Sequence, residues 1–173
     1  MKKNIDQTGK LKSYYNSPIG LIEITGTGNS ITSLYFVEQN INPKFEPNSY
    51  LENCAVQLDE YFNGKRKDFD LKLEPEGSEF QKKVWDELKN IQYGETKSYL
   101  QISQLLGDEL AIRAVANANG QNKISIVIPC HRVIGSNGSL TGYAGGLWRK
   151  KWLLQHEQKF GCGEEQTELF EKP

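Results

Sequence analysis

The chain has 173 residues and is 37% hydrophobic, enough to bury the core of one large or two small domains, and no apolar stretch nears the roughly 20 residues that span a bilayer. Three widely spaced cysteines and two histidines predict neither a disulfide framework nor a structural zinc site, and free thiols favour a reducing cytoplasm. The net charge of −1 is unevenly distributed, because residues 76–160 hold 11 Lys and Arg against 8 Asp and Glu.

The first predicted element along the chain is an antiparallel meander within residues 11–37. Its segments SYYNSP, GLIEIT and ITSLYFV are rich in β-branched and aromatic residues, and Pro- and Gly-containing turns separate them. A helix is predicted at residues 49–62, where apolar residues, including Cys54, recur on one helical face. We expect residues 65–77 to form an exposed connector, and residues 1–75 to form an N-terminal α/β domain.

Residues 76–160 are predicted to form a second domain that begins with two helices. Each helix starts at a capping box, formed by Ser78 with Gln81 and by Ser98 with Gln101. Gly107 ends the second helix, and Asp108 is placed to cap a further helix over residues 109–119. Two short helices joined by a tight turn indicate a helix-turn-helix, which is a DNA-binding motif but also a common packing unit.

The last third of the chain combines a predicted strand, a glycine-rich loop and a helix. ISIVI at residues 124–128 predicts a buried strand, and PCHRV follows it directly. Five glycines lie in the loop 135–146, and an apolar stripe predicts a helix over residues 147–156. Residues 161–173 carry four glutamates and few apolar groups, so we expect an acidic, flexible tail.

Cys130 is the candidate for reactive chemistry. A thiol is a strong nucleophile only as thiolate, and it needs a nearby base or cation to reach that form. His131 is adjacent in sequence, but neighbours in an extended segment point in opposite directions, so a water between them is expected. Glu157 is able to orient His131 as a carboxylate orients the imidazole of a triad. The residues alone leave open the alternative of a buried, inert cysteine.

Three motifs in fixed order carry a family resemblance: PCHRV at 129–133, GYAGG at 142–146 and HE at 156–157. Together with further residues between Phe80 and Glu157, they resemble the O6-alkylguanine-DNA alkyltransferases, also called methylated-DNA–protein-cysteine methyltransferases. The resemblance implies an α+β fold with two parts. The N-terminal domain is a ribonuclease H-like antiparallel sheet with a helix, and the mainly helical C-terminal domain contains a winged-helix-like helix-turn-helix.

The resemblance also implies a single-turnover DNA repair reaction. The protein binds the minor groove of double-stranded DNA as a monomer, flips O6-alkylguanine out of the duplex and transfers its alkyl group irreversibly to Cys130. O4-alkylthymine is a second candidate lesion. No cofactor and no metal are implied, because the lesion itself is the alkyl donor.

The family's functional residues carry over to specific positions of this chain. Cys130 is the acceptor, His131 and Glu157 form the activating relay, and Tyr99 rotates the nucleotide and donates to the base. The DNA-contacting helix is represented by Arg113, Ala114, Ala116 and Asn117. The guanine pocket is represented by Ser125, Val133, Tyr143 and Ala144. Asn122 is implied as a structural hinge and Arg132 as an ion-pair residue.

Three positions depart from the family pattern and concern the range of alkyl groups accepted. Lys123 and Ser125 stand where many relatives have proline, or at position 125 also alanine, and Ala144 stands where some have serine. Three alternatives remain for the whole chain: a lesion-binding relative without transfer activity, a helix-turn-helix regulator, and a cysteine hydrolase. The first is disfavoured because such relatives lack the cysteine.

Overall fold

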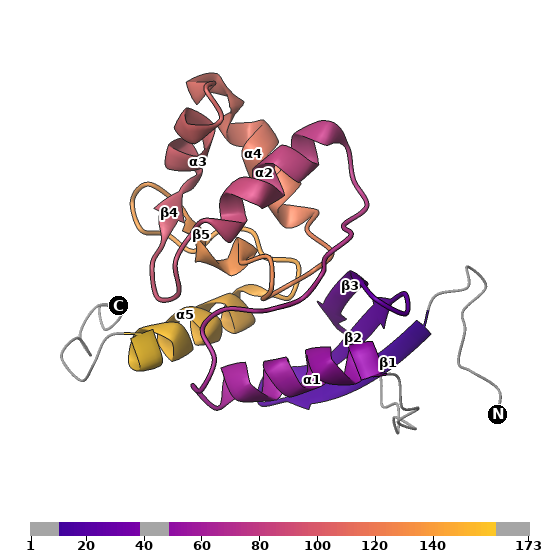
Figure 1. Cartoon of the computed structure of the whole chain (residues 1–173). Coiled ribbons are helices and arrows are strands. Elements are labelled where there is room, and N and C mark those ends of the chain that lie inside the picture. Colours follow the sequence, from indigo (N-terminus) through magenta and orange to yellow (C-terminus); the bar gives the residue numbers. More distant parts are fainter. Residues whose placement is uncertain (1–10, 39–48, 162–173) are drawn as a thin grey trace.

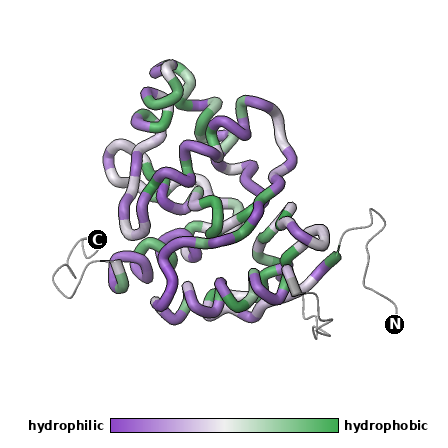
Figure 2. Tube along the Cα trace, viewed as in Figure 1, coloured by the Kyte–Doolittle hydropathy of each residue, from purple (hydrophilic) through white to green (hydrophobic). Residues whose placement is uncertain are grey.

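The structure, a computed structural model, describes residues 11–38 and 49–161. Its N-terminal part is an antiparallel sheet of β1 (Leu11–Ser17), β2 (Gly20–Gly26) and β3 (Ile31–Phe36), in that spatial order. Helix α1 (Ser49–Phe62) packs along this sheet (Figure 1). Hydrophobic and hydrophilic residues alternate along α1 in Figure 2, as expected of a helix with one face on a sheet. The predicted meander and helix are therefore confirmed.

The segment predicted as an exposed connector, residues 65–77, has no buried residue, and it also bridges to the edge of the sheet. Ile31 donates its N–H to Lys72 O at 2.9 Å and accepts from Glu74 N at 2.9 Å. A second segment pairs farther along the same strand, because Leu34 N donates to Lys123 O at 2.8 Å. The free edge of β3 supplies the unpaired backbone groups for both contacts. This edge therefore joins the N-terminal sheet to the segment that precedes Cys130.

The C-terminal part is mainly helical. Its elements are α2 (Glu79–Lys89), β4 (Lys97–Ser98), α3 (Tyr99–Leu105), the 3-10 helix η1 (Glu109–Ala111), α4 (Ile112–Gly120), the 3-10 helix η2 (Cys130–Arg132), β5 (Val133–Ile134) and α5 (Leu147–Gly161). Both predicted capping boxes are present, at the starts of α2 and α3. The α+β fold class is confirmed, and no described helix is both long and apolar enough to cross a membrane.

The helix predicted from residue 109 differs from the expectation at its start. The Asp108 side chain caps the chain as predicted, accepting from Leu110 N at 2.9 Å, but it caps one turn of 3-10 helix before α4 begins. Gly107 has φ +82°, a left-handed conformation that glycine adopts at little cost, and it ends α3. The predicted flexible tail lies outside the described residues except for Gly161, which ends α5.

The strand predicted at residues 124–128 is wrong. Ile124 makes a single bridge to Leu34, and the chain then turns. Val127 N donates to Ser125 O at 2.8 Å across Ile126, whose φ is +70°. A hydrogen bond between residues i and i+2 with positive φ at the central residue is a strained γ-turn, and a β-branched residue there is uncommon. The isoleucines are buried, as expected, but burial alone does not distinguish a strand from consecutive turns.

Candidate active site

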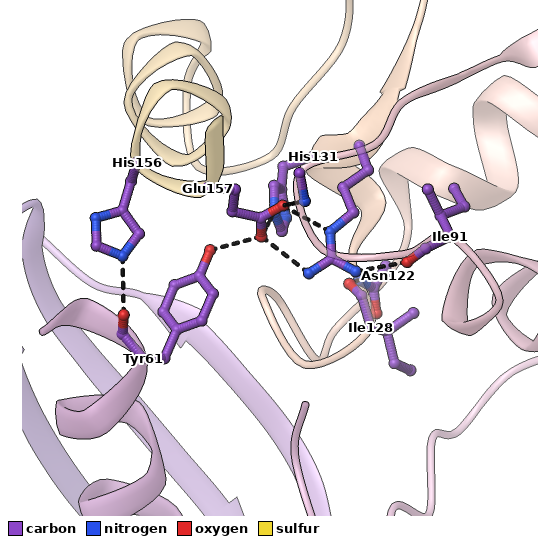
Figure 3. Close-up of polar contacts among 9 residues, drawn as sticks. Tyr61, Ile91, Asn122, Ile128, His131, His156 and Glu157 are labelled. Carbon is purple, nitrogen blue, oxygen red and sulfur yellow. Dashed lines mark hydrogen bonds and ion pairs between the residues drawn. The ribbon is translucent and has the colours of Figure 1, made fainter. Parts of the chain in front are cut away.

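A buried carboxylate, Glu157 of α5, lies at the centre of the site. Its Oε1 accepts from Tyr61 OH at 2.8 Å, contacts His131 Nε2 at 2.8 Å and accepts from Arg132 Nη2 at 2.9 Å. Its Oε2 accepts from Arg132 Nε at 2.8 Å and from Gly94 N at 3.1 Å. Figure 3 shows Tyr61 and His131 approaching this carboxylate from different elements. Glu157 therefore joins α1, the α2–β4 loop, η2 and α5.

These contacts keep Glu157 ionised. Burial by itself would raise the pKa of Glu157, but His131 and Arg132 outweigh it and hold that pKa far below its ordinary value. Arg132, predicted as an ion-pair residue, forms a bidentate pair with Glu157, and its Nη1 also donates to Ile91 O at 2.6 Å. The sequence did not predict its contact with Glu157, because the partners are 25 positions apart.

His131 is fully buried beside this anion. Because a neutral imidazole that donates from Nε2 to a carboxylate keeps the lone pair on Nδ1, His131 is a base at Nδ1. No hydrogen-bond partner of Nδ1 is found among the described residues. Burial lowers the pKa of His131, while Glu157 opposes the shift. In its neutral form the ring is able to accept a proton at Nδ1.

Cys130 begins η2 and is 4% exposed. Burial raises the pKa of its thiol, and a hydrogen bond from Asn122 opposes that shift. Asn122 Nδ2 lies 3.1 Å from Cys130 Sγ, and the same amide group donates to Ile128 O and accepts from Ile124 N. The amide thus holds the turn that carries Cys130 and also contacts the sulfur. The resemblance implied Asn122 as a structural hinge and did not imply its contact with the sulfur.

Tyr99 and Lys150 meet at one carbonyl of the glycine-rich loop. Tyr99 OH donates to Thr141 O at 3.1 Å, and Lys150 Nζ donates to the same oxygen at 2.7 Å. Lys150 is completely buried, which lowers its pKa to about 8, and its charge acts on Cys130. The sequence did not single out Lys150, because a lysine on a terminal helix ordinarily predicts a solvated charge.

The predicted pocket residues fall into two groups. Ser125 and Ala144 line a pocket of about 610 Å³, which is also bounded by Phe36 of β3 and Trp85 of α2. Val133 is fully buried. Tyr143 is half-buried, and burial raises its pKa well above the ordinary value. Neither Val133 nor Tyr143 lines this pocket.

Helix α4 divides into a packed and an exposed face. Val115 and Ala118 are buried, and Trp85 Nε1 donates to Ala118 O at 2.8 Å. The exposed or partly exposed face carries the predicted DNA-contacting residues, namely Arg113, Ala114, Ala116 and Asn117. Small side chains beside one arginine allow close approach of a backbone to another surface. Within the described ranges, no three His, Cys, Asp or Glu side chains lie together in a way that could hold a metal ion.

The comparisons with known proteins all indicate the same family. Residues 10–75 match the family model for the ribonuclease-like domain of 6-O-methylguanine DNA methyltransferase, and residues 79–159 match the model for its DNA-binding domain. A methylated-DNA–protein-cysteine methyltransferase of Methanosarcina acetivorans is 47% identical over 150 residues, which cover 83% of this chain and 95% of that protein. One of Mycolicibacterium paratuberculosis is 46% identical, with coverages of 83% and 90%.

Solved structures agree with the sequence comparisons. The crystal structure of the Mycobacterium tuberculosis O6-methylguanine methyltransferase superposes with a TM-score of 0.79 at 39% identity, covering 88% of this chain and 95% of that one. The same protein in complex with DNA gives a TM-score of 0.79 at 42% identity, with coverages of 86% and 93%. The chain belongs to the O6-methylguanine DNA methyltransferase family.

Proposed function

We propose that this protein repairs O6-alkylguanine in double-stranded DNA by moving the alkyl group onto Cys130, once per molecule. The observation that carries the proposal is the buried His131–Glu157 pair beside Cys130, at 2.8 Å, with a base at Nδ1 of His131. A cysteine that is activated only during the reaction requires three resting states: a protonated thiol, a neutral imidazole and an ionised carboxylate. The same arrangement disfavours a regulator with an incidental cysteine.

In the proposed reaction, His131 Nδ1 takes the proton of Cys130 through an intervening water. The thiolate attacks the alkyl carbon in line, a carbon–sulfur bond forms and the bond from carbon to O6 breaks. Guanine gains a proton from Tyr99, which recovers one from water as protonated His131 releases one to water, so the net change is the thiol's proton moved to the base. Tyr99 OH donates to Thr141 O when no base is bound, and it turns to the base as negative charge develops there. The alkyl group of the thioether product is not readily removed from sulfur, so Cys130 reacts only once.

DNA recognition is proposed for α4 in the minor groove. Arg113 enters the duplex and fills the space of the flipped nucleotide, while Ala114, Ala116 and Asn117 allow close contact with the backbone. Flipping costs a few kcal/mol and less for a poorly paired base, so the lesion helps to select itself. Minor-groove contact suits a search for damage, because that groove carries little sequence information.

We also propose that the protein works as a monomer in the cytoplasm. All residues of the proposed relay come from one chain, and both described cysteines, Cys54 and Cys130, are free thiols. A reducing compartment keeps such thiols available. Ser125 and Ala144 are proposed to form part of the wall of the guanine pocket.

The test is intact-mass spectrometry after incubation with duplex DNA that contains O6-methylguanine. One methyl group should appear on the peptide with Cys130, at no more than one equivalent per protein. Cys130→Ser should abolish the adduct, whereas the matched variant Cys54→Ser should retain it, because Cys54 is buried in the core and burial raises its pKa to about 12. Folded protein that takes up no methyl group would refute the proposed function.

A further inference from the structure

The N-terminal part of the chain contributes one residue to the proposed relay. Tyr61, in the last turn of α1, is fully buried and donates its hydroxyl to Glu157 Oε1 at 2.8 Å, across 96 positions of sequence. The same oxygen contacts His131 Nε2 at 2.8 Å (Figure 3). The hydroxyl of Tyr61 and the imidazole of His131 therefore share one carboxylate oxygen.

The position of Tyr61 is fixed by its backbone and its ring. Its carbonyl oxygen lies 2.8 Å from His156 Nε2. Its ring lies 5.3 Å from the Phe62 ring, 5.5 Å from Phe69 and 5.9 Å from Tyr93, measured between centroids. A buried hydroxyl without a partner is costly, and Glu157 is the described partner of this one. Packing and hydrogen bonding thus hold the donor on Oε1.

A donor on Oε1 changes how strongly Glu157 acts on His131. Hydrogen bonds to a carboxylate disperse its negative charge and lower its basicity. We propose that Tyr61 is a positioning residue for alkyl transfer, which fixes Oε1 of Glu157 and limits the basicity that this carboxylate confers on His131. The inference rests on the proposed function, because it concerns the proton acceptor of that reaction.

The direction of the effect follows from the charges around the pair. The titratable and charged groups around it are Tyr61 from α1, Tyr93 from the α2–β4 loop, Cys130 and Arg132 from η2, Tyr143 from the glycine-rich loop, and Lys150 and His156 from α5. Of these groups, Tyr61→Phe alters only Tyr61. Without its hydroxyl, Oε1 carries more charge, stabilises protonated His131 better and raises the pKa of His131.

The test is the pH profile of single-turnover methyl transfer in Tyr61→Phe, which keeps the ring and removes the hydroxyl. Transfer requires unprotonated Nδ1, so its rate falls on the acidic side of the profile. This limb should move to higher pH by about half to one unit, which slows transfer about three- to tenfold at acidic pH and leaves the alkaline plateau in place. A purely structural role for Tyr61 would lower the rate equally at every pH.

Two matched variants control for loss of a tyrosine hydroxyl. Tyr15→Phe removes an exposed hydrogen bond, 3.1 Å long, from β1 to Asp59 of α1. Tyr93→Phe removes a buried hydroxyl near Glu157 that has no hydrogen-bond partner among the described residues. Both profiles should overlay that of the unaltered protein. A shift in Tyr93→Phe equal to that in Tyr61→Phe would overturn the proposal.

A second measurement tests the effect of Tyr61 on His131 independently of alkyl transfer. The chain has only two histidines, so NMR titration of the imidazoles gives the pKa of His131 without any substrate. That pKa should rise in Tyr61→Phe. If the unaltered protein transfers no methyl group, the proposed function fails, and the titration alone then shows whether Tyr61 acts on His131. If transfer occurs but neither the profile nor the pKa moves, the inference on Tyr61 is overturned and the function stands.

Discussion

Replacing Glu157 by glutamine removes the one anion that Arg132 and His131 share. Gln keeps the size of the side chain, but Arg132 is 6% exposed and would lose both charged hydrogen bonds, at 2.8 and 2.9 Å. Breaking a buried ion pair from one side costs about 3–5 kcal/mol, because an uncompensated charge stays buried. For a domain of this size, such a loss lowers Tm by about 6–20 °C.

The assay is urea unfolding at pH 7, with Glu60→Gln as matched control. Glu60 also pairs with an arginine, Arg66, at 2.6 Å, but these side chains are 39% and 29% exposed. A pair with that exposure contributes at most about 1 kcal/mol. If Glu157→Gln destabilises the protein no more than Glu60→Gln, the assigned role of Glu157 as a buried structural anion is wrong.

The pH dependence of stability provides a second readout of the same variant. Because the folded pKa of Glu157 lies below its ordinary value of 4.5, its contribution is present in full above about pH 5 and is lost as the pH falls toward the folded pKa. The free-energy difference between the unaltered protein and Glu157→Gln should therefore shrink as the pH is lowered below about 5. A difference that stays constant between pH 7 and pH 3 would contradict the depressed pKa.

Two further predictions concern residues outside the relay. Arg113→Ala should slow repair in duplex DNA more than reaction with free O6-alkylguanine base, because only the duplex requires flipping; single-turnover rates on both substrates check this, and equal losses would exclude the proposed role. Arg149→Met should destabilise the protein by about 2–3 kcal/mol in thermal unfolding, because the buried guanidinium donates to Ile19 O and Gly145 O, both at 2.8 Å. The exposed neighbour Lys151→Met should change stability by less than about 0.5 kcal/mol.

The helix starts were predictable because their signals are local. A capping box needs a serine and a glutamine three positions apart, and both boxes form with the expected partners. The end of α3 at Gly107 was predictable because glycine adopts positive φ at little cost. The sheet was predictable from its β-branched and aromatic segments between turns. The pairing of residues 72–74 and 123–125 with β3 was not predictable, because it joins segments distant in sequence.

The region around Cys130 was less predictable from local pattern. ISIVI has the apolar run of a buried strand, yet the chain turns there, because Asn122 satisfies backbone groups of Ile124 and Ile128 that a neighbouring strand would otherwise pair. The family resemblance supplied Cys130, His131 and Glu157 as candidates, and the structure places His131 Nε2 2.8 Å from Glu157 Oε1.

The sequence by itself determined the candidate site residues, the α+β composition and the helix starts at the two capping boxes, since these depend on residue type and short-range spacing. Tertiary structure alone decided what surrounds Glu157. In the sequence, Tyr61 is one apolar position on a helix face and Arg132 is one charged residue. Packing in the folded chain brings both to the same carboxylate. Burial then decides protonation, because excluding water raises the cost of each unpaired charge and strengthens each paired one.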